Sequence, residues 1–145
     1  MRLADRKNGG RFTATDAKKR AAEALAAGKI GVLLVAGGQG SRLGFDYPKG
    51  MFPIAPVTQA SLFQIHAEKI LARSRICGYA IPWYIMTSPT NDAQTRDYFA
   101  SKNYFGLSPD QVSFFTQGTM PAVDIATGRI LMAGKGEIFT SPNGH

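Results

Sequence analysis

The chain has 145 residues, 44% of them hydrophobic, which suits one globular domain with a substantial core. Its 17 basic residues outnumber the 10 acidic ones but are scattered, so a small phosphorylated ligand explains the net charge of +7 at least as well as nucleic acid does. The charged N-terminus is unlike a secretory signal, and no apolar run approaches the roughly 20 residues of a membrane span, so we expect a cytoplasmic protein.

Helix and strand signals alternate from the start of the chain. Residues 13–29 have helix composition, with Thr15 or Asp16 as the N-cap and Gly28 as the stop. The nearly continuous apolar run IGVLLVA, residues 30–36, is typical of a strand that is buried on both faces of a parallel sheet. A glycine-rich loop follows this strand.

The remaining chain continues the alternation. The expected elements are a helix over 61–75, a strand over 81–88, a helix over 91–103, a strand over 111–117 and two short strands within 128–145. Ser61 and Gln64 predict a capping box on the first of these helices, and Thr90 or Asn91 caps the second. This order predicts an α/β domain whose mostly parallel sheet is flanked by helices and binds a ligand at the carboxyl ends of its strands.

The loop VAGGQGSRLGFDYPKG, residues 35–50, has the general form of a phosphate cradle. It is not a dinucleotide fingerprint, because Gly44 lies one residue too far along, and not a Walker A loop, because Gly50 follows Lys49 in place of Ser or Thr. It offers Arg42 and Lys49 as two cations that suit phosphoryl or nucleotidyl transfer. The structural alternative is a surface turn with solvated bases.

The segment LLVAGGQGSRLGFDYPKG resembles the signature of the UDP-sugar pyrophosphorylases, with Ser41 in place of the usual Thr. The segments SLFQIHAEKIL, IPWYIMTS, YFGL, VSFFTQGTMPA and SPNGH extend the resemblance to the UDP-N-acetylglucosamine, or N-acetylhexosamine, branch. The resemblance implies a Rossmann-like nucleotide-binding domain over 30–145, preceded by a lead and helix over 1–29. It also implies a uridylyltransferase that makes a UDP-sugar and pyrophosphate from UTP and a sugar 1-phosphate with Mg²⁺, with no nucleic acid or membrane partner.

Matching the family's motif by position assigns roles to individual residues. The resemblance implies that the UTP-binding residues are Ala36, Gly37, Gly38, Gly40, Ser41, Gln117 and Gly144. It implies that Arg42 and Lys49 are catalytic and stabilise the charge that develops as the sugar phosphate attacks the α-phosphorus. A glutamine suits the uracil contact because its amide offers both a donor and an acceptor. The metal ligands are expected outside this chain, and neither Asp124 nor Glu137 is proposed as one.

The resemblance leaves two points open, namely how much of the enzyme this chain represents and which sugar 1-phosphate is the substrate. Family members run to several hundred residues, so we expect an N-terminal fragment that is incomplete for catalysis. GlcNAc 1-phosphate is the expected sugar, but His145 stands where that branch has Asn, which keeps glucose 1-phosphate or a broader specificity as the alternative. A non-catalytic nucleotide-binding fragment and a small basic nucleic-acid-binding domain are alternatives of a different class. The second alternative needs exposed aromatics, whereas Trp83 and Phe114 lie in strand-like runs.

Overall fold

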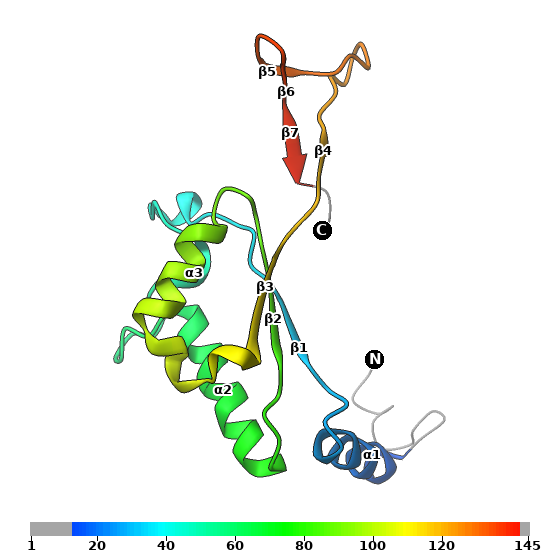
Figure 1. The fold of residues 1–145 in the computed structure, drawn as a ribbon, viewed down its shortest axis with the longest axis vertical. Helices are drawn as coiled ribbons and strands as arrows, with labels where there is room; N and C mark the ends of the chain where they lie inside the picture. The colour runs from blue at the N-terminus through cyan, green and yellow to red at the C-terminus, as the bar shows by residue number, and fades with distance from the viewer. Residues whose placement is uncertain (1–12, 143–145) are drawn as a thin grey trace.

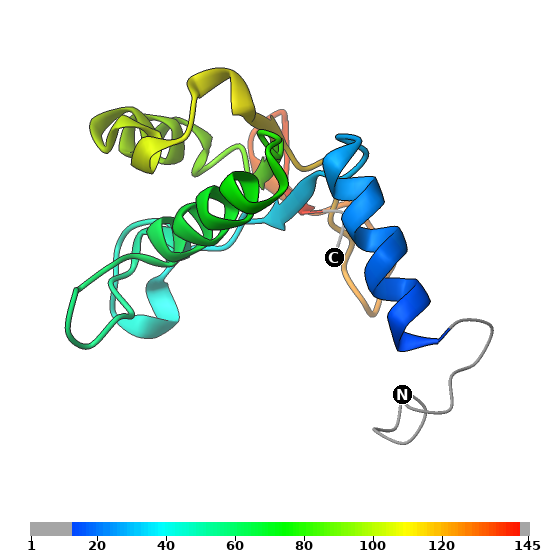
Figure 2. The same ribbon diagram turned by 90° about the horizontal axis from the view of Figure 1, so that it is seen from below.

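The computed structural model describes residues 13–142 and has a three-stranded parallel sheet at its centre (Figure 1). The strands lie in the order β1-β2-β3 and comprise β1 (Val32–Val35), β2 (Trp83–Thr87) and β3 (Val112–Thr116). The two crossovers contain α2 (Leu62–Cys77) and α3 (Asp92–Ser101), which lie on the same side of the strands in Figures 1 and 2. The expected α/β architecture with a parallel sheet and flanking helices is therefore confirmed.

The first helix, α1 (Ala14–Ala26), lies at the lower end of β1 (Figure 1). Thr13 is its N-cap and forms a capping box with Asp16, so the predicted N-cap at Thr15 or Asp16 is wrong by two or three positions. Thr13 takes this role because its extended backbone directs its hydroxyl oxygen at the Asp16 N–H. Gly28 has a φ of 65° and ends the helix as predicted.

The second helix begins where the sequence predicts. The Ser61 hydroxyl accepts a hydrogen bond from the Gln64 backbone N–H at 3.2 Å. The Gln64 side chain does not return this contact but donates to Glu68 one turn further on, so only half of the predicted capping box forms. Gly78, in the left-handed conformation, ends α2.

The core lies between the sheet and the two crossover helices. Its buried members are Phe63, Ala67, Ile70, Ile81, Trp83, Ile85, Phe99, Leu107 and Val112. The ring of Phe99 on α3 is fully buried, and its centroid lies 5.1 to 5.4 Å from those of Phe63, Trp83, Phe105 and Phe114. All four contacts are edge-on, the arrangement that aromatic pairs prefer. Phe99 therefore joins both helices to two strands.

The other face of the sheet is open in the described chain. Register places Leu33 beside Tyr84 and Val35 beside Met86, which in turn pairs with Phe115. On this face Leu33 is 64% exposed and Val35 is 50% exposed. The prediction that residues 30–36 are buried on both faces is therefore wrong, because α2 and α3 cover one face and no element within residues 13–142 packs over the other.

Residues 119–142 form an extended arm that projects beyond the sheet (Figure 1). Its pairs are antiparallel and comprise β4 (Thr119–Pro121) with β7 (Thr140–Pro142) and β5 (Met132–Gly134) with β6 (Glu137–Ile138). The short hairpin β5–β6 confirms the predicted pair of tail strands. The pairing of β4 with β7 was not predicted, because these short strands are far apart in the sequence and no single turn links them. No helix in the described part of the chain has the length and apolar character that crossing a membrane requires.

Candidate functional site

The loop that follows β1 doubles back on itself at the carboxyl end of the sheet. Gln39 and Pro48 form an antiparallel bridge, and the Lys49 backbone N–H donates to the Gly38 carbonyl at 3.1 Å. The outer turn of the loop contains the short 3-10 helix η2 (Ser41–Leu43). The segment of the loop that returns to the sheet ends in a second 3-10 helix, η3 (Lys49–Met51), and this helix packs on α2. The bridge thus brings the two ends of the glycine loop together.

A cavity of about 200 Å³ lies between these two ends of the loop. Its lining consists of Val35, Ala36, Gly37, Gly38, Lys49 and Gly50. Four of the residues that the sequence predicts for nucleotide binding or catalysis are therefore brought together: Ala36, Gly37, Gly38 and Lys49. Three of these contribute little or no side chain, so the backbone of the loop forms most of the cavity wall.

Gln117 approaches the same loop from the end of β3. Its side chain is buried, and a Cβ at Gly37 would lie 2.9 Å from the Gln117 Oε1, so a larger residue at position 37 would displace this amide. The Oε1 atom is buried and has no hydrogen-bond partner among residues 13–142. A buried acceptor without a donor is unfavourable by about 1–3 kcal/mol. This unpaired acceptor lies next to Gly37, which lines the cavity, although Gln117 itself is outside the set of lining residues.

The remaining predicted residues of the loop lie at its outer turn. Gly40 is buried there and donates from its backbone N–H to the Tyr47 carbonyl at 2.9 Å. Ser41 and Arg42 lie on η2 with exposed side chains and are outside the set that lines the cavity. The two cations of the loop are thus separated, with Lys49 at the cavity and Arg42 at the outer turn. Gly144 lies outside the described residues.

The described residues do not form a metal site. No group of three or more His, Cys, Asp or Glu side chains within residues 13–142 could hold a metal ion. Asp124 lies in the arm, where the side-chain hydroxyl and backbone N–H of Thr127 both donate to its carboxylate at 2.7 Å. These hydrogen bonds from Thr127 hold the pKa of Asp124 below its usual value. Asp124 thus stabilises a turn, and the residues present do not fit a divalent cation.

His66 lies on α2, away from the loop cavity. It lines a different hollow of about 220 Å³ together with Val32, Lys69, Ile70, Arg73 and Ile81. Burial lowers the pKa of His66, and the charge of Lys69 lowers it further, so the imidazole is neutral at pH 7. His66 is therefore separate from the residues that line the loop cavity.

Sequence reasoning missed two residues that shape the loop. A Cβ at Gly50 would lie 2.2 Å from the ring of Phe63, so this glycine lets η3 rest directly on α2. Asn91 was predicted only as a helix cap, but its fully buried side chain donates to the Ala36 carbonyl at 3.1 Å. Neither role has a local sequence signal, because each contact joins residues that are far apart in the chain.

Comparison with known proteins identifies related sequences along nearly the whole chain. The profile of the UTP–glucose-1-phosphate uridylyltransferase family matches residues 6–145. UDP-N-acetylglucosamine diphosphorylase 1 of Arabidopsis thaliana is 46% identical over 128 residues, which cover 81% of this chain and 25% of that protein. UDP-N-acetylglucosamine pyrophosphorylase of Saccharomyces cerevisiae is 44% identical over 126 residues, covering 85% of this chain and 26% of that protein.

Solved structures show the same relationship in the fold. The uridine diphosphate N-acetylglucosamine pyrophosphorylase of Trypanosoma brucei matches with a TM-score of 0.81 and 38% identity, over 97% of this chain and 29% of that one. A putative UDP-N-acetylglucosamine pyrophosphorylase of Entamoeba histolytica matches with a TM-score of 0.80 and 35% identity, over 97% and 36%. The chain spans about a quarter of the length of the curated relatives that it matches.

Proposed function

Because this chain belongs to the UTP–glucose-1-phosphate uridylyltransferase family, we propose that it supplies the uridine-binding part of an enzyme that transfers a uridylyl group from UTP to a sugar 1-phosphate. The products are a UDP-sugar and pyrophosphate. The observation that carries this proposal is the buried, unpartnered Oε1 of Gln117 beside the glycine-walled cavity.

The hydrogen-bonding groups of uracil match those of the Gln117 amide, and its ring suits the glycine-walled cavity. Its N3–H is a donor flanked by two carbonyl acceptors, and the Gln117 amide offers an acceptor at Oε1 and a donor at Nε2. A uracil that donates to Oε1 would remove the unfavourable orphaned acceptor. The backbone of Ala36, Gly37 and Gly38 would lie against the nucleoside, since this part of the loop has almost no side chain.

Lys49 is the proposed phosphate-side group, because it lines the cavity beside the loop backbone. In the proposed reaction an oxygen of the sugar phosphate attacks the α-phosphorus of UTP, and the bond from that phosphorus to the bridging oxygen of pyrophosphate breaks. Lys49 would stabilise the charge that develops on the phosphoryl oxygens. The nucleophile is already an anion, so the reaction needs no general base.

The resemblance alone supports the proposed roles of Arg42 in catalysis and of Gly40, Ser41 and Gly144 in UTP binding. In this proposal Arg42 and Ser41 extend the phosphate subsite along the outer turn of the loop. Mg²⁺ is also proposed from the resemblance and would add positive charge at the phosphates. Its ligands would come from outside the described residues, since none of these form a cation site.

GlcNAc 1-phosphate is the proposed sugar substrate, because the Arabidopsis and yeast relatives are both named for UDP-N-acetylglucosamine. Glucose 1-phosphate is the second candidate, because the family description names it. A panel of sugar 1-phosphates, with pyrophosphate release as the readout, separates the two. The test uses the protein as its complete gene encodes it, since the chain spans about a quarter of these relatives.

Calorimetric titration of the same protein with UTP tests the nucleotide assignment. UTP should bind at least tenfold more tightly than ATP, and Gln117→Leu should weaken UTP binding about tenfold, because it removes a hydrogen-bonding partner from a buried site. Gln94→Leu, which changes an exposed glutamine on α3, should leave the affinity unchanged. Equal affinity for UTP and ATP, or salt-sensitive RNA binding without UTP preference, would overturn the proposal.

A further inference from the structure

The two sides of the proposed uridine site are attached to neighbouring carbonyls of the central strand. The Ala36 N–H, at the end of β1, donates to the Met86 carbonyl at 2.7 Å. The Gln117 N–H, at the end of β3, donates to the Thr87 carbonyl at 2.8 Å. The end of β2 therefore sets the spacing between the loop backbone and the glutamine.

The parallel ladder between β1 and β2 is interrupted directly after this point. In a parallel ladder, a residue that donates to one carbonyl of its neighbour accepts from the N–H two residues further along that neighbour. The next bond of the ladder would therefore run from the Ser88 N–H to the Ala36 carbonyl. Instead, the Ser88 N–H donates to the Asn91 Oδ1 at 2.8 Å, and the Asn91 Nδ2 donates to the Ala36 carbonyl at 3.1 Å.

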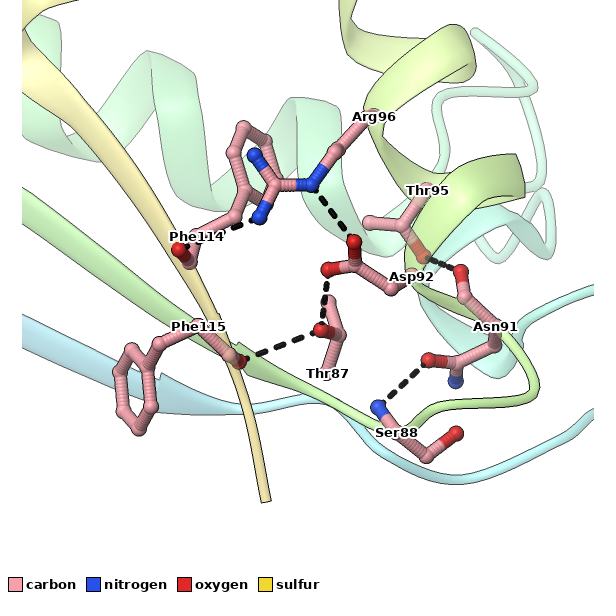
Figure 3. Close-up of polar contacts among 8 residues, drawn as sticks. All are labelled: Thr87, Ser88, Asn91, Asp92, Thr95, Arg96, Phe114 and Phe115. Atoms are coloured by element: carbon pink, nitrogen blue, oxygen red, sulfur yellow. Dashed lines mark hydrogen bonds and ion pairs between the residues drawn. The ribbon is translucent and has the colours of Figure 1, made fainter.

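One carboxamide thus takes the place of one bond of the ladder. Its donor and its acceptor are both used, and the Asn91 side chain is fully buried. Figure 3 shows this side chain turned toward Ser88 at the end of β2. The inserted amide separates the backbones of β1 and β2 where the nucleotide loop begins, and it satisfies both polar groups that the separation would leave unpaired.

The start of α3 is held against β2 and β3 by a second set of contacts, which keeps Asn91 in place (Figure 3). The Asp92 carboxylate accepts from the Thr87 hydroxyl at 2.5 Å and from the Arg96 Nε at 2.7 Å. Arg96 also donates to the Phe114 carbonyl at 3.2 Å. The turn that carries Asn91 is therefore bonded to both β2 and β3.

We propose that Asn91 is a positioning residue for UTP, because its amide holds the Ala36 end of the nucleotide loop at the separation from Gln117 that a uracil requires. This inference rests on the proposed function. Asn91 occupies the N-cap position of α3 as predicted, but its side chain makes no capping hydrogen bond to that helix. The contact with Ala36 leaves the turn and reaches the first residue of the loop, 55 positions earlier in the chain.

Asn91→Asp separates the two contacts. The aspartate keeps an oxygen for the Ser88 N–H but places its second oxygen, in place of an N–H donor, against the Ala36 carbonyl. Asn91→Ala removes both contacts and allows the Ser88 N–H to bond directly to Ala36, which would close the separation between the strands. Either variant should displace the start of the loop.

The test measures UTP turnover and pyrophosphate inhibition in the protein as its complete gene encodes it. Asn91→Asp should raise the KM for UTP about tenfold, with kcat and the inhibition constant of pyrophosphate each within about twofold of wild type. The matched control is Thr95→Val, which removes the hydrogen bond from the Thr95 hydroxyl to the Asn91 backbone carbonyl, 2.8 Å long, in the same turn. This control should lower the melting temperature and leave the KM for UTP unchanged.

The possible results separate this inference from the proposed function. A raised KM for UTP in Asn91→Asp and Asn91→Ala, but not in Thr95→Val, supports the positioning role. If Asn91→Asp lowers the melting temperature as Thr95→Val does and leaves the KM for UTP at the wild-type value, Asn91 is only structural and the inference is wrong. A wild-type protein that shows no preference for UTP overturns the proposed function, and the positioning role with it.

Discussion

The two faces of the central sheet have similar side chains but different surroundings. On the covered face, Trp83 and Ile85 of β2 are completely buried beneath α2 and α3. On the open face, Tyr84 of the same strand is 44% exposed and Leu33 beside it is 64% exposed. Alternation along the strands determines which residues share a face. Whether that face is covered depends on elements elsewhere in the chain.

The nucleotide loop depends on the covered face. Its returning end, η3, packs on α2 at Gly50 and Phe63, and its first residue, Ala36, is bonded to Asn91 at the start of α3. The contacts that shape the proposed site and those that form the core therefore share the same two helices. Substitutions on the two faces should consequently differ both in stability and in nucleotide binding.

The largest difference is expected between Phe99 and Phe115. Phe99→Ala removes a fully buried ring at the centre of the core and should lower the free energy of unfolding by about 3–5 kcal/mol. Phe115→Ala, on the open face where the residue is 42% exposed, should lower it by less than about 1 kcal/mol. Urea unfolding measures both. Equal losses would show that the open face is covered in solution.

The next effect is at the contact between the loop and the core. Gly50→Ala would place a Cβ 2.2 Å from the Phe63 ring and should lower the free energy of unfolding by about 1–3 kcal/mol while weakening UTP binding. Adding Phe63→Leu creates space for the methyl group and should restore part of the UTP affinity. If the single variant binds UTP normally, the packing of the loop on α2 does not shape the site.

A smaller effect is expected at the start of α2. Ser61→Ala removes the buried hydroxyl that accepts from the Gln64 N–H and should lower the free energy of unfolding by about 1 kcal/mol. Ser113→Ala, on the open face, is the matched control and should change it by less than about 0.5 kcal/mol. Thermal unfolding compares the two. A control that is as destabilising as Ser61→Ala would contradict the difference between the faces.

The smallest expected effect is a dependence on pH at the start of α3. Burial alone would raise the pKa of Asp92, but hydrogen bonds from Arg96 and Thr87 and the charge of Arg96 lower it below 3.8. A carboxyl whose pKa is depressed by folding contributes stability above its unfolded pKa, and this contribution is lost as the pH falls through the folded value. Part of the stability should therefore disappear below about pH 4.

Arg96→Met tests this dependence on pH. The variant keeps an apolar stem over Phe114 and removes both the ion pair and the hydrogen bond to Asp92. Its free energy of unfolding should fall less than that of wild type between pH 5 and pH 3, taken as roughly one unit on each side of an ordinary carboxyl pKa. Identical pH profiles would show that Arg96 does not contribute to this dependence on pH.

Local signals predicted much of the fold and part of the site. Ser61 is the N-cap of α2 and Gly28 follows the end of α1 as predicted, because capping and left-handed glycine are properties of a few neighbouring residues. The cavity contains Ala36, Gly37, Gly38 and Lys49 because a glycine-rich turn after a strand returns to the sheet edge. The sequence did not predict that Arg42 lies away from the cavity. Arg42 lies there because the Gln39–Pro48 bridge separates the outer turn of the loop from its two ends.

The sequence by itself determined the order of the helices and of the three strands of the parallel sheet, the position of the glycine loop and the membership of the family, since each depends on residues that are adjacent or in a fixed order. Only the tertiary structure decided that Gln117 lies against Gly37, that the Asn91 amide replaces a bond between β1 and β2, and that one face of the sheet is open in the described chain. These features depend on contacts between distant segments, and periodicity and capping rules carry no information about which distant side chains meet.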